Sequence, residues 1–311
     1  MPPPRSTRAR RSRSRPERVV VRRALGRLTV LVALLALGGV PAAAHDFWIQ
    51  PDDWTPAPDT LQRVWLRVGD SVPGESYPRT PQHIQRFVIV GPDGGPDGGP
   101  DGGPDGTNDV EGQAGADPAG IAGVDGAGLY LIGYESNATE VELDPAKFES
   151  YLRDEGLTDA LRRHAARPDG LAMVREAFSR CAKALLRVGD APHTGYDRNL
   201  GFTLELIPET DPYALAPGGE LPVRVVYEGA PLADTQVSAR PADGSDHRIV
   251  ARTDAAGRAR LRLDRAGPWL VKSVHILADP PGRSVAWESF WASLGFELPA
   301  GANAAGEVAA P

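Results

Sequence analysis

The sequence is poor in cysteine: Cys181 is the only one among 311 residues. A lone cysteine cannot close an internal disulfide, so packing must stabilise the fold even in an oxidising compartment. We expect this thiol to be buried in the core.

Familiar catalytic motifs are absent as well. The sequence has no Gly-x-Ser-x-Gly elbow, no His-Glu-x-x-His helix, no phosphate loop and no Cys-x-x-Cys pair. Hydrolase, nucleotide-binding and zinc-ribbon chemistry therefore lack support. No apolar run of membrane-spanning length follows the one near the amino terminus, so we expect no transmembrane helix in the rest of the chain.

Residues 1–44 have the features of a secretory signal peptide. Ten arginines and one acid accompany the apolar run Leu28–Leu37, and Ala42-Ala43-Ala44 forms a cleavage signature. Cleavage after Ala44 makes His45 the first residue of the mature chain. The composition favours a bacterial periplasm, and Arg22-Arg23 fits a twin-arginine signal only in part, so the export route (Sec or Tat) stays open.

The mature chain is strongly acidic. Without the leader it has 24 basic and 40 acidic residues, a net charge near −16. Such a field repels nucleic acid and anionic membranes and concentrates cations.

Residues 45–207 predict a β domain that contains two excursions. Runs such as Arg63–Val68 and Arg86–Val90 are typical of strands. The Gly-Pro-Asp repeat of residues 91–106 has no apolar side chains and predicts a disordered loop. Residues 144–187 predict a helical excursion, with Asp144-Pro145 as cap and first position, followed by a second helical run at about Leu171–Leu186.

Residues 208–298 have a compact all-β pattern with regular turns, typical of an immunoglobulin-like or transthyretin-like sandwich. The last strand, 288–298, places Phe290, Ala292, Leu294, Phe296 and Leu298 on a core face. Residues 299–311 predict a flexible tail. The fold class is therefore mainly β with a helical insertion, in two β-sandwich regions.

A processed amino terminus at His45 is a candidate metal chelate. The α-amine and the imidazole both lose protons near neutrality when a divalent cation competes for them. His275, at the end of the strand Trp269–His275, is the leading second ligand, with Asp46 and Glu288 as possible oxygen ligands. The alternative is that His275 only ends a strand and has a backbone partner.

Other histidines and the tryptophans fit simpler roles. His83, His164, His193 and His247 have no partner at three or four residues' spacing and are expected on the solvated surface. Trp48, Trp287 and Trp291 either line a pocket or, as is commoner, form a seam in the core.

Several segments together resemble a known family. They are His45-Asp-Phe-Trp48 after a leader, Lys147–Leu157, Ser179–Lys183 and Asp211-Pro-Tyr213. The chain resembles exported bacterial proteins of unknown function described as periplasmic components of cobalt or nickel transport. The resemblance implies a metal-handling protein whose carboxyl-terminal half is immunoglobulin-like or carboxypeptidase-regulatory-like, with His45 and His275 as ligands.

We therefore expect a periplasmic protein that binds nickel, cobalt or copper and delivers or buffers the ion for a membrane metal transporter. Two alternatives remain. One is a copper-dependent oxidative enzyme in which two histidines form a brace; the other is a metal-free β interaction module in which His45 has no role.

Overall fold

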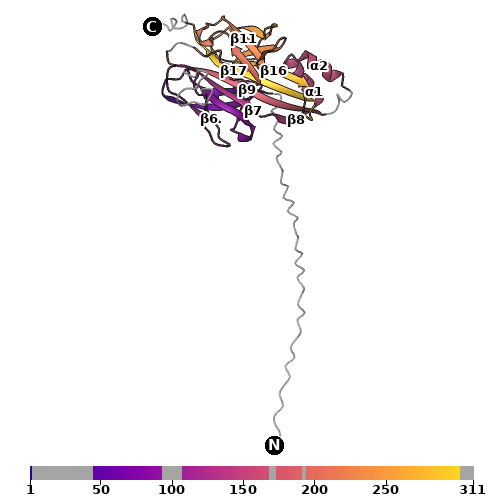
Figure 1. Cartoon of the computed structure of the whole chain (residues 1–311). Helices are drawn as coiled ribbons and strands as arrows, with labels where there is room; N and C mark the ends of the chain where they lie inside the picture. Colours follow the sequence, from indigo (N-terminus) through magenta and orange to yellow (C-terminus); the bar gives the residue numbers. More distant parts are fainter. Residues whose placement is uncertain (2–44, 93–106, 168–172, 191–193, 302–311) are drawn as a thin grey trace. The chain divides into compact units, whose positions relative to one another are not determined.

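The computed structural model describes residues 1, 45–92, 107–167, 173–190 and 194–301 (Figure 1). The predicted leader (except Met1), His193, and most of the predicted loop at 91–106 and of the predicted tail lie outside these ranges. The described residues from His45 onward belong to one compact unit. No helix among the described residues is long and apolar enough to cross a membrane.

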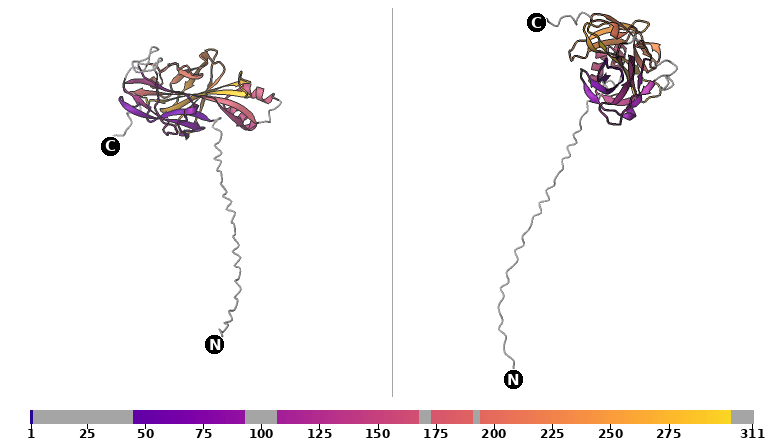
Figure 2. Two further views of the ribbon diagram at one scale, coloured as in Figure 1. Left: turned by 60° about the horizontal axis from the view of Figure 1, so that its bottom comes forward. Right: turned by 90° about the vertical axis from the view of Figure 1, so that its left-hand side faces the viewer.

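A nine-stranded sheet forms the centre of the molecule (Figures 1 and 2). The strands β17 and β9 are parallel, and every other pair in this sheet is antiparallel. In spatial order the strands are β14 (Ile249–Arg252), β13 (Gln236–Pro241), β16 (Gly267–Ala278), β17 (Trp287–Leu298), β9 (Val174–Val188), β7 (Gly128–Ser136), β4 (Ile84–Val90) and β5 (Thr107–Asp109), with β8 (Thr139–Leu143) also paired to β9.

Two four-stranded sheets cover opposite faces of the central sheet. The first contains β1 (Asp46–Pro51), β2 (Thr60–Gly69), β3 (Glu75–Tyr77) and β6 (Gly120–Val124). The second contains β10 (Leu204–Pro208), β11 (Glu220–Tyr227), β12 (Ala230–Pro231) and β15 (Arg258–Arg262). The mainly β fold class is confirmed.

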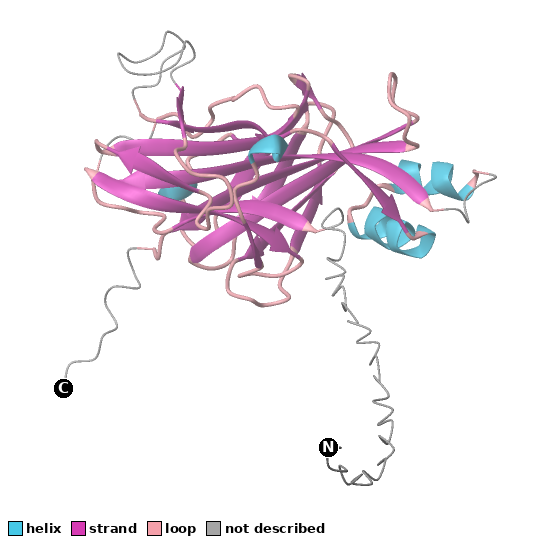
Figure 3. Ribbon diagram, turned by 90° about the horizontal axis from the view of Figure 1, so that it is seen from below, coloured by secondary structure: helices cyan, strands magenta, loops and turns pink. Residues whose placement is uncertain are grey.

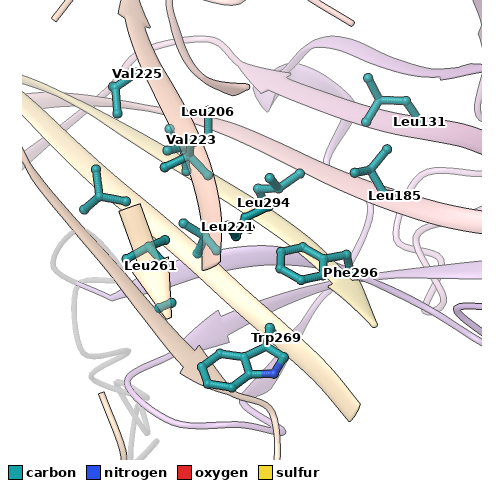
Figure 4. Packing of buried hydrophobic residues seen from close by; sticks show 14 of the residues in the cluster. Leu131, Leu185, Leu206, Leu221, Val223, Val225, Leu261, Trp269, Leu294 and Phe296 are labelled. Atoms are coloured by element: carbon teal, nitrogen blue, oxygen red, sulfur yellow. The ribbon is translucent and has the colours of Figure 1, made fainter. Parts of the chain in front are cut away.

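Side-chain alternation in the central strands builds a separate core on each face. In β9, Ala182 and Ala184 pack with the first small sheet, whereas Cys181 and Leu185 pack with the second. Figure 4 shows the second core, which includes Leu185 and Leu294. The predicted core face of the last strand lies in this second core, and Cys181 is buried there as expected.

The predicted boundary between residues 207 and 208 runs through this shared architecture. Strands from both sides of it, β9 and β17, are neighbours in one sheet. The two β regions thus have a sheet in common.

Two helices, α1 (Pro145–Asp154) and α2 (Thr158–Ala165), lie at one end of the strands (Figure 3). Asp144 caps α1 as predicted: its Oδ1 accepts hydrogen bonds from the amides of Ala146 and Lys147. Phe148 and Leu152 are buried in a third core with Trp287. Two short 3-10 helices, Pro81–His83 and Pro212–Ala214, complete the elements.

The second predicted helical run, Leu171–Leu186, is wrong. Residues Val174–Val188 form β9, a central strand that is covered on both faces. Such a strand has an almost continuous buried run without polar alternation, and over this length apolar spacing alone does not separate it from a buried helix. The helical excursion therefore ends at Ala165.

Candidate functional site

His45 lies beside Asp70 because of the register between β1 and β2. These strands are antiparallel and pair Asp46 with Gly69, so the residue before β1 meets the residue after β2. His45 Nδ1 is 2.7 Å from Asp70 Oδ1. The His45 side chain is 26% exposed and that of Asp70 is 73% exposed, so this pair is open to solvent.

Asp46 is the centre of a buried ion cluster. Its Oδ1 lies 2.6 Å from Lys272 Nζ, and its Oδ2 lies 2.7 Å from Arg240. Lys272 Nζ also lies 2.6 Å from Oε1 of Glu155, the residue that follows α1. Although burial opposes the charged form, the two carboxylates raise the pKa of Lys272. Both oxygens of Asp46 are engaged, so this residue anchors β1 and is not a free metal ligand.

His275 lies on the opposite face of the central sheet. Lys272, which reaches Asp46, and His275 are three residues apart in β16, and an odd separation in a strand places side chains on opposite faces. The His275 ring lies 4.5 Å from the ring centroid of Tyr227. Burial lowers the pKa of His275, partly offset by Glu228, which favours a neutral imidazole.

Glu288 shares the face of His275. The register of β16 and β17 pairs His275 with Phe290 and Leu277 with Glu288, so the histidine and the glutamate are diagonal neighbours. Glu288 Oε1 is 2.5 Å from Arg283 Nε, which forms an ion pair at the strand end.

The four predicted ligands therefore fall into two pairs: His45 with Asp46, and His275 with Glu288. The central sheet separates them. Among the described residues no group of three His, Cys, Asp or Glu side chains is arranged to hold a metal ion. The chelate that remains geometrically open is that of His45 itself, with Asp70 as its neighbour.

A family model described as "Domain of unknown function (DUF4198)" matches residues 42–277. The chain belongs to the DUF4198 family. The match includes His45, Asp70 and His275 and ends before Glu288. None of the curated proteins gives a significant match.

Three solved structures have a weak likeness to this DUF4198 chain. A tetra-tandem repeat in the extending region of a large adhesion protein is 15% identical and has a TM-score of 0.21; the alignment covers 82% of this chain and half (50%) of that one. The D00-D0 domain of Intimin is 12% identical over 80% of this chain and 98% of that one, with a TM-score of 0.19. The D0-D1 domain of Intimin is 12% identical over 81% and 97%, with a TM-score of 0.20. TM-scores this low support no inference about function.

The remaining histidines differ in part from expectation. His164 is buried between Phe148 and Trp287, at 2% exposure, so its predicted surface position is wrong. The reason is that the side chain of His164 lies on the face of α2 that packs against the third core. His83 is half-buried, and its Nδ1 lies 2.6 Å from the hydroxyl of Tyr77. His247 is half-buried too, close to Asp264.

The three tryptophans considered for a pocket are all buried. Trp48, Trp287 and Trp291 have exposures of 7% or less, in agreement with a role in the core. Trp287 is also part of the wall of a cavity beside α2.

Asp70, Arg240 and Lys272 were not among the predicted site residues. A signal for Lys272 was present, because a lone lysine inside the apolar strand Trp269–His275 needs a buried anionic partner. The proximity of Asp70 to His45 follows only from the pairing of residues 46–51 with residues 64–69.

Proposed function

We propose that this DUF4198 chain is an exported protein that binds a divalent transition-metal ion at its processed amino terminus. The α-amine and Nδ1 of His45 form the chelate, and the Asp70 carboxylate is the third ligand. The protein buffers nickel, cobalt or copper, or delivers it to a membrane importer.

The contact between His45 Nδ1 and Asp70 Oδ1, at 2.7 Å, is the observation that carries the proposal. Nδ1 is the ring nitrogen that closes a six-membered chelate ring with the residue's own amine. A set of two nitrogens and one carboxylate oxygen suits divalent ions of the later first-row transition metals. The excess of acids in the mature chain favours cations near its surface.

The rigidity of the neighbouring strand supports the same proposal. Asp46 is fixed by Lys272 and Arg240, so the residue that follows the chelate is held in place. Preorganisation of this kind lowers the entropy lost when an ion binds.

The copper brace is less well supported. It requires two imidazoles at one ion, and β16 places His275 on the face of the central sheet opposite Asp46. A metal-free module remains the outcome expected if the amino terminus binds no ion.

Calorimetric titration with NiCl2 and CoCl2 tests the proposal on protein whose first residue is His45. We expect His45→Ala to weaken binding on the order of 100-fold, because the remaining amine and carboxylate no longer form a chelate. Asp70→Ala should weaken it by about tenfold, the loss of a single ligand.

His275→Ala is the matched control, since it removes an imidazole on the other face. It should leave the affinity within about threefold of the parent value. The proposal fails if His45→Ala binds as tightly as the parent, or if His275→Ala is the variant that abolishes binding.

A further inference from the structure

A cavity lies at an edge of the central sheet. It has a volume of about 790 Å³ and lies between α2, the end of β16 and the segment 232–235. His275 is part of its wall, but the proposed metal site does not use this cavity. The size is typical of a binding site.

The cavity exists because β13 leaves β16 before β16 ends. Their pairing stops at Val237 opposite Ser273, whereas β16 continues to Ala278 along β17. The segment just before β13 pairs instead with the residues that follow β14. There the amide of Thr253 donates a hydrogen bond to the carbonyl of Thr235. Within the described chain, no strand pairs with the outer side of β16 beyond Ser273.

The backbone groups of β16 point into this opening. The hydroxyl of Thr235 donates to the carbonyl of Val274 at 3.4 Å, so that carbonyl faces the outer side. Backbone groups alternate along a strand, and the N–H and C=O groups of Ile276 and Ala278 therefore face the same side. The amide of Asp279 donates to Ala286 on the inner side, which agrees with this alternation. An open edge of this kind is a template for another strand.

The rim of the cavity has a small excess of positive charge. Arg162, Arg163 and Arg252 line it together with Asp159 and Asp234. Asp159 neutralises Arg162 and Asp234 neutralises Arg252, whereas Arg163 is exposed and forms no ion pair with any described residue. Since the whole chain has 41 acidic and 34 basic residues, this local excess of positive charge runs against the overall balance.

Apolar side chains complete the wall. Leu232 and Leu277 contribute to it on the face of the second core, whereas Trp287 lies on the face of the third core. A strand presents alternate side chains to opposite sides, so an added strand can place apolar residues against this wall and acidic residues toward the arginines.

We propose that an extended acidic segment of a partner protein adds to the edge of β16. Its backbone pairs with Ile276 and Ala278, and its carboxylates contact Arg163. The free edge of β16 runs only from Val274 to Ala278, so the contact is short and the affinity modest.

Fluorescence anisotropy with a labelled hexapeptide of alternating Glu and Val tests this proposal on the processed full-length protein. We expect saturable binding that weakens about tenfold in Arg163→Glu. Arg262→Glu is the control, because Arg262 is an exposed residue of β15 outside the cavity. A Lys-Val hexapeptide should not bind. Equal binding of the acidic and basic peptides, or an unchanged affinity in Arg163→Glu, overturns the proposal.

Backbone pairing is tested separately from charge. Hydrogen exchange at the amides of Ile276 and Ala278 should slow when the acidic peptide is bound, and a backbone N-methylated form of the peptide should lose affinity. Ala278→Pro removes one edge donor, and proline is tolerated at sheet edges; circular dichroism checks that this variant is folded. An N-methylated peptide that binds as well as the parent peptide would mean simple anion binding and would refute strand addition.

Discussion

Glu176 is a buried carboxyl group whose Oε1 links α1 to the central sheet. It is fully buried, and the hydroxyl of Tyr151 in α1 donates to its Oε1 at 2.9 Å. Ser289 of β17 contacts the same oxygen. Burial raises the pKa of Glu176 from 4.5 to about 7, despite these two hydrogen bonds.

This raised pKa predicts that stability falls as the pH rises from about 4.5 to 7. The folded state keeps the proton through that window while the unfolded state releases it, so folding becomes less favourable as the pH increases and levels off above the folded pKa. Glu176→Gln mimics the protonated form and should remove this dependence, with a gain of about 3 kcal/mol above pH 7.

Urea denaturation at a series of pH values measures this effect. The control is Glu142→Gln, an exposed residue of β8, which should keep the parent pH dependence. A Glu176→Gln variant with the same pH dependence as the parent would contradict the raised pKa of Glu176.

Lys183 and Glu205 form a fully buried ion pair. Lys183 Nζ lies 2.8 Å from Glu205 Oε1, and the exposures are 1% and 0%. Glu205 also accepts hydrogen bonds from the amides of Leu200, Gly201 and Phe202, which ties the segment before β10 to β9.

Lys183→Met should destabilise the protein by about 3 to 5 kcal/mol, because it leaves the Glu205 carboxylate buried without its cation. The comparison is Arg260→Met, which removes an exposed pair with Glu220 and should cost less than about 1 kcal/mol. Chemical denaturation measures the free energy of unfolding of the two variants. Equal losses of stability in the two variants would contradict the role assigned to the buried pair.

At the scale of elements, the cap of α1 gives a local prediction. Asp144→Ala removes the acceptor for two amides of the first turn and should cost about 1 kcal/mol. Hydrogen exchange should become faster in Pro145–Asp154 and stay unchanged in β7. Uniform acceleration across the molecule would mean that α1 does not open on its own.

Elements with a strong local pattern were predictable from the sequence. The cap at Asp144 and the alternation of Phe290, Leu294 and Leu298 are short-range features, and both predictions are confirmed. The strand β9 was not predictable in this way because the two four-stranded sheets cover both of its faces, and only the tertiary arrangement reveals that.

The candidate site was predictable only in part for a similar reason. Position after the leader singles out His45, and position near a strand end singles out His275. Whether they meet depends on sheet topology, and β16 carries His275 to the face opposite Lys272 and its partner Asp46. The neighbour of His45 is instead Asp70, through the hairpin-like register of β1 and β2.

At the scale of the whole molecule, a central sheet with a different core on each face separates two surfaces. One surface contains the His45 and Asp70 pair. The other surface, at the end of β16, contains His275 in a cavity whose rim has a small excess of positive charge. We therefore expect metal binding and peptide binding to be independent: nickel at saturating concentration should change the affinity for the acidic peptide by less than about twofold.

The most direct test of the metal site compares two forms of the protein that differ only in processing. One begins at His45, and the other keeps residues 40–44 in front of it, which moves the free amine away from the imidazole. Nickel affinity measured by calorimetry at about pH 7 should be on the order of 100-fold higher for the form that begins at His45, because only that form has the chelate. Equal nickel affinity in the two forms would contradict the account.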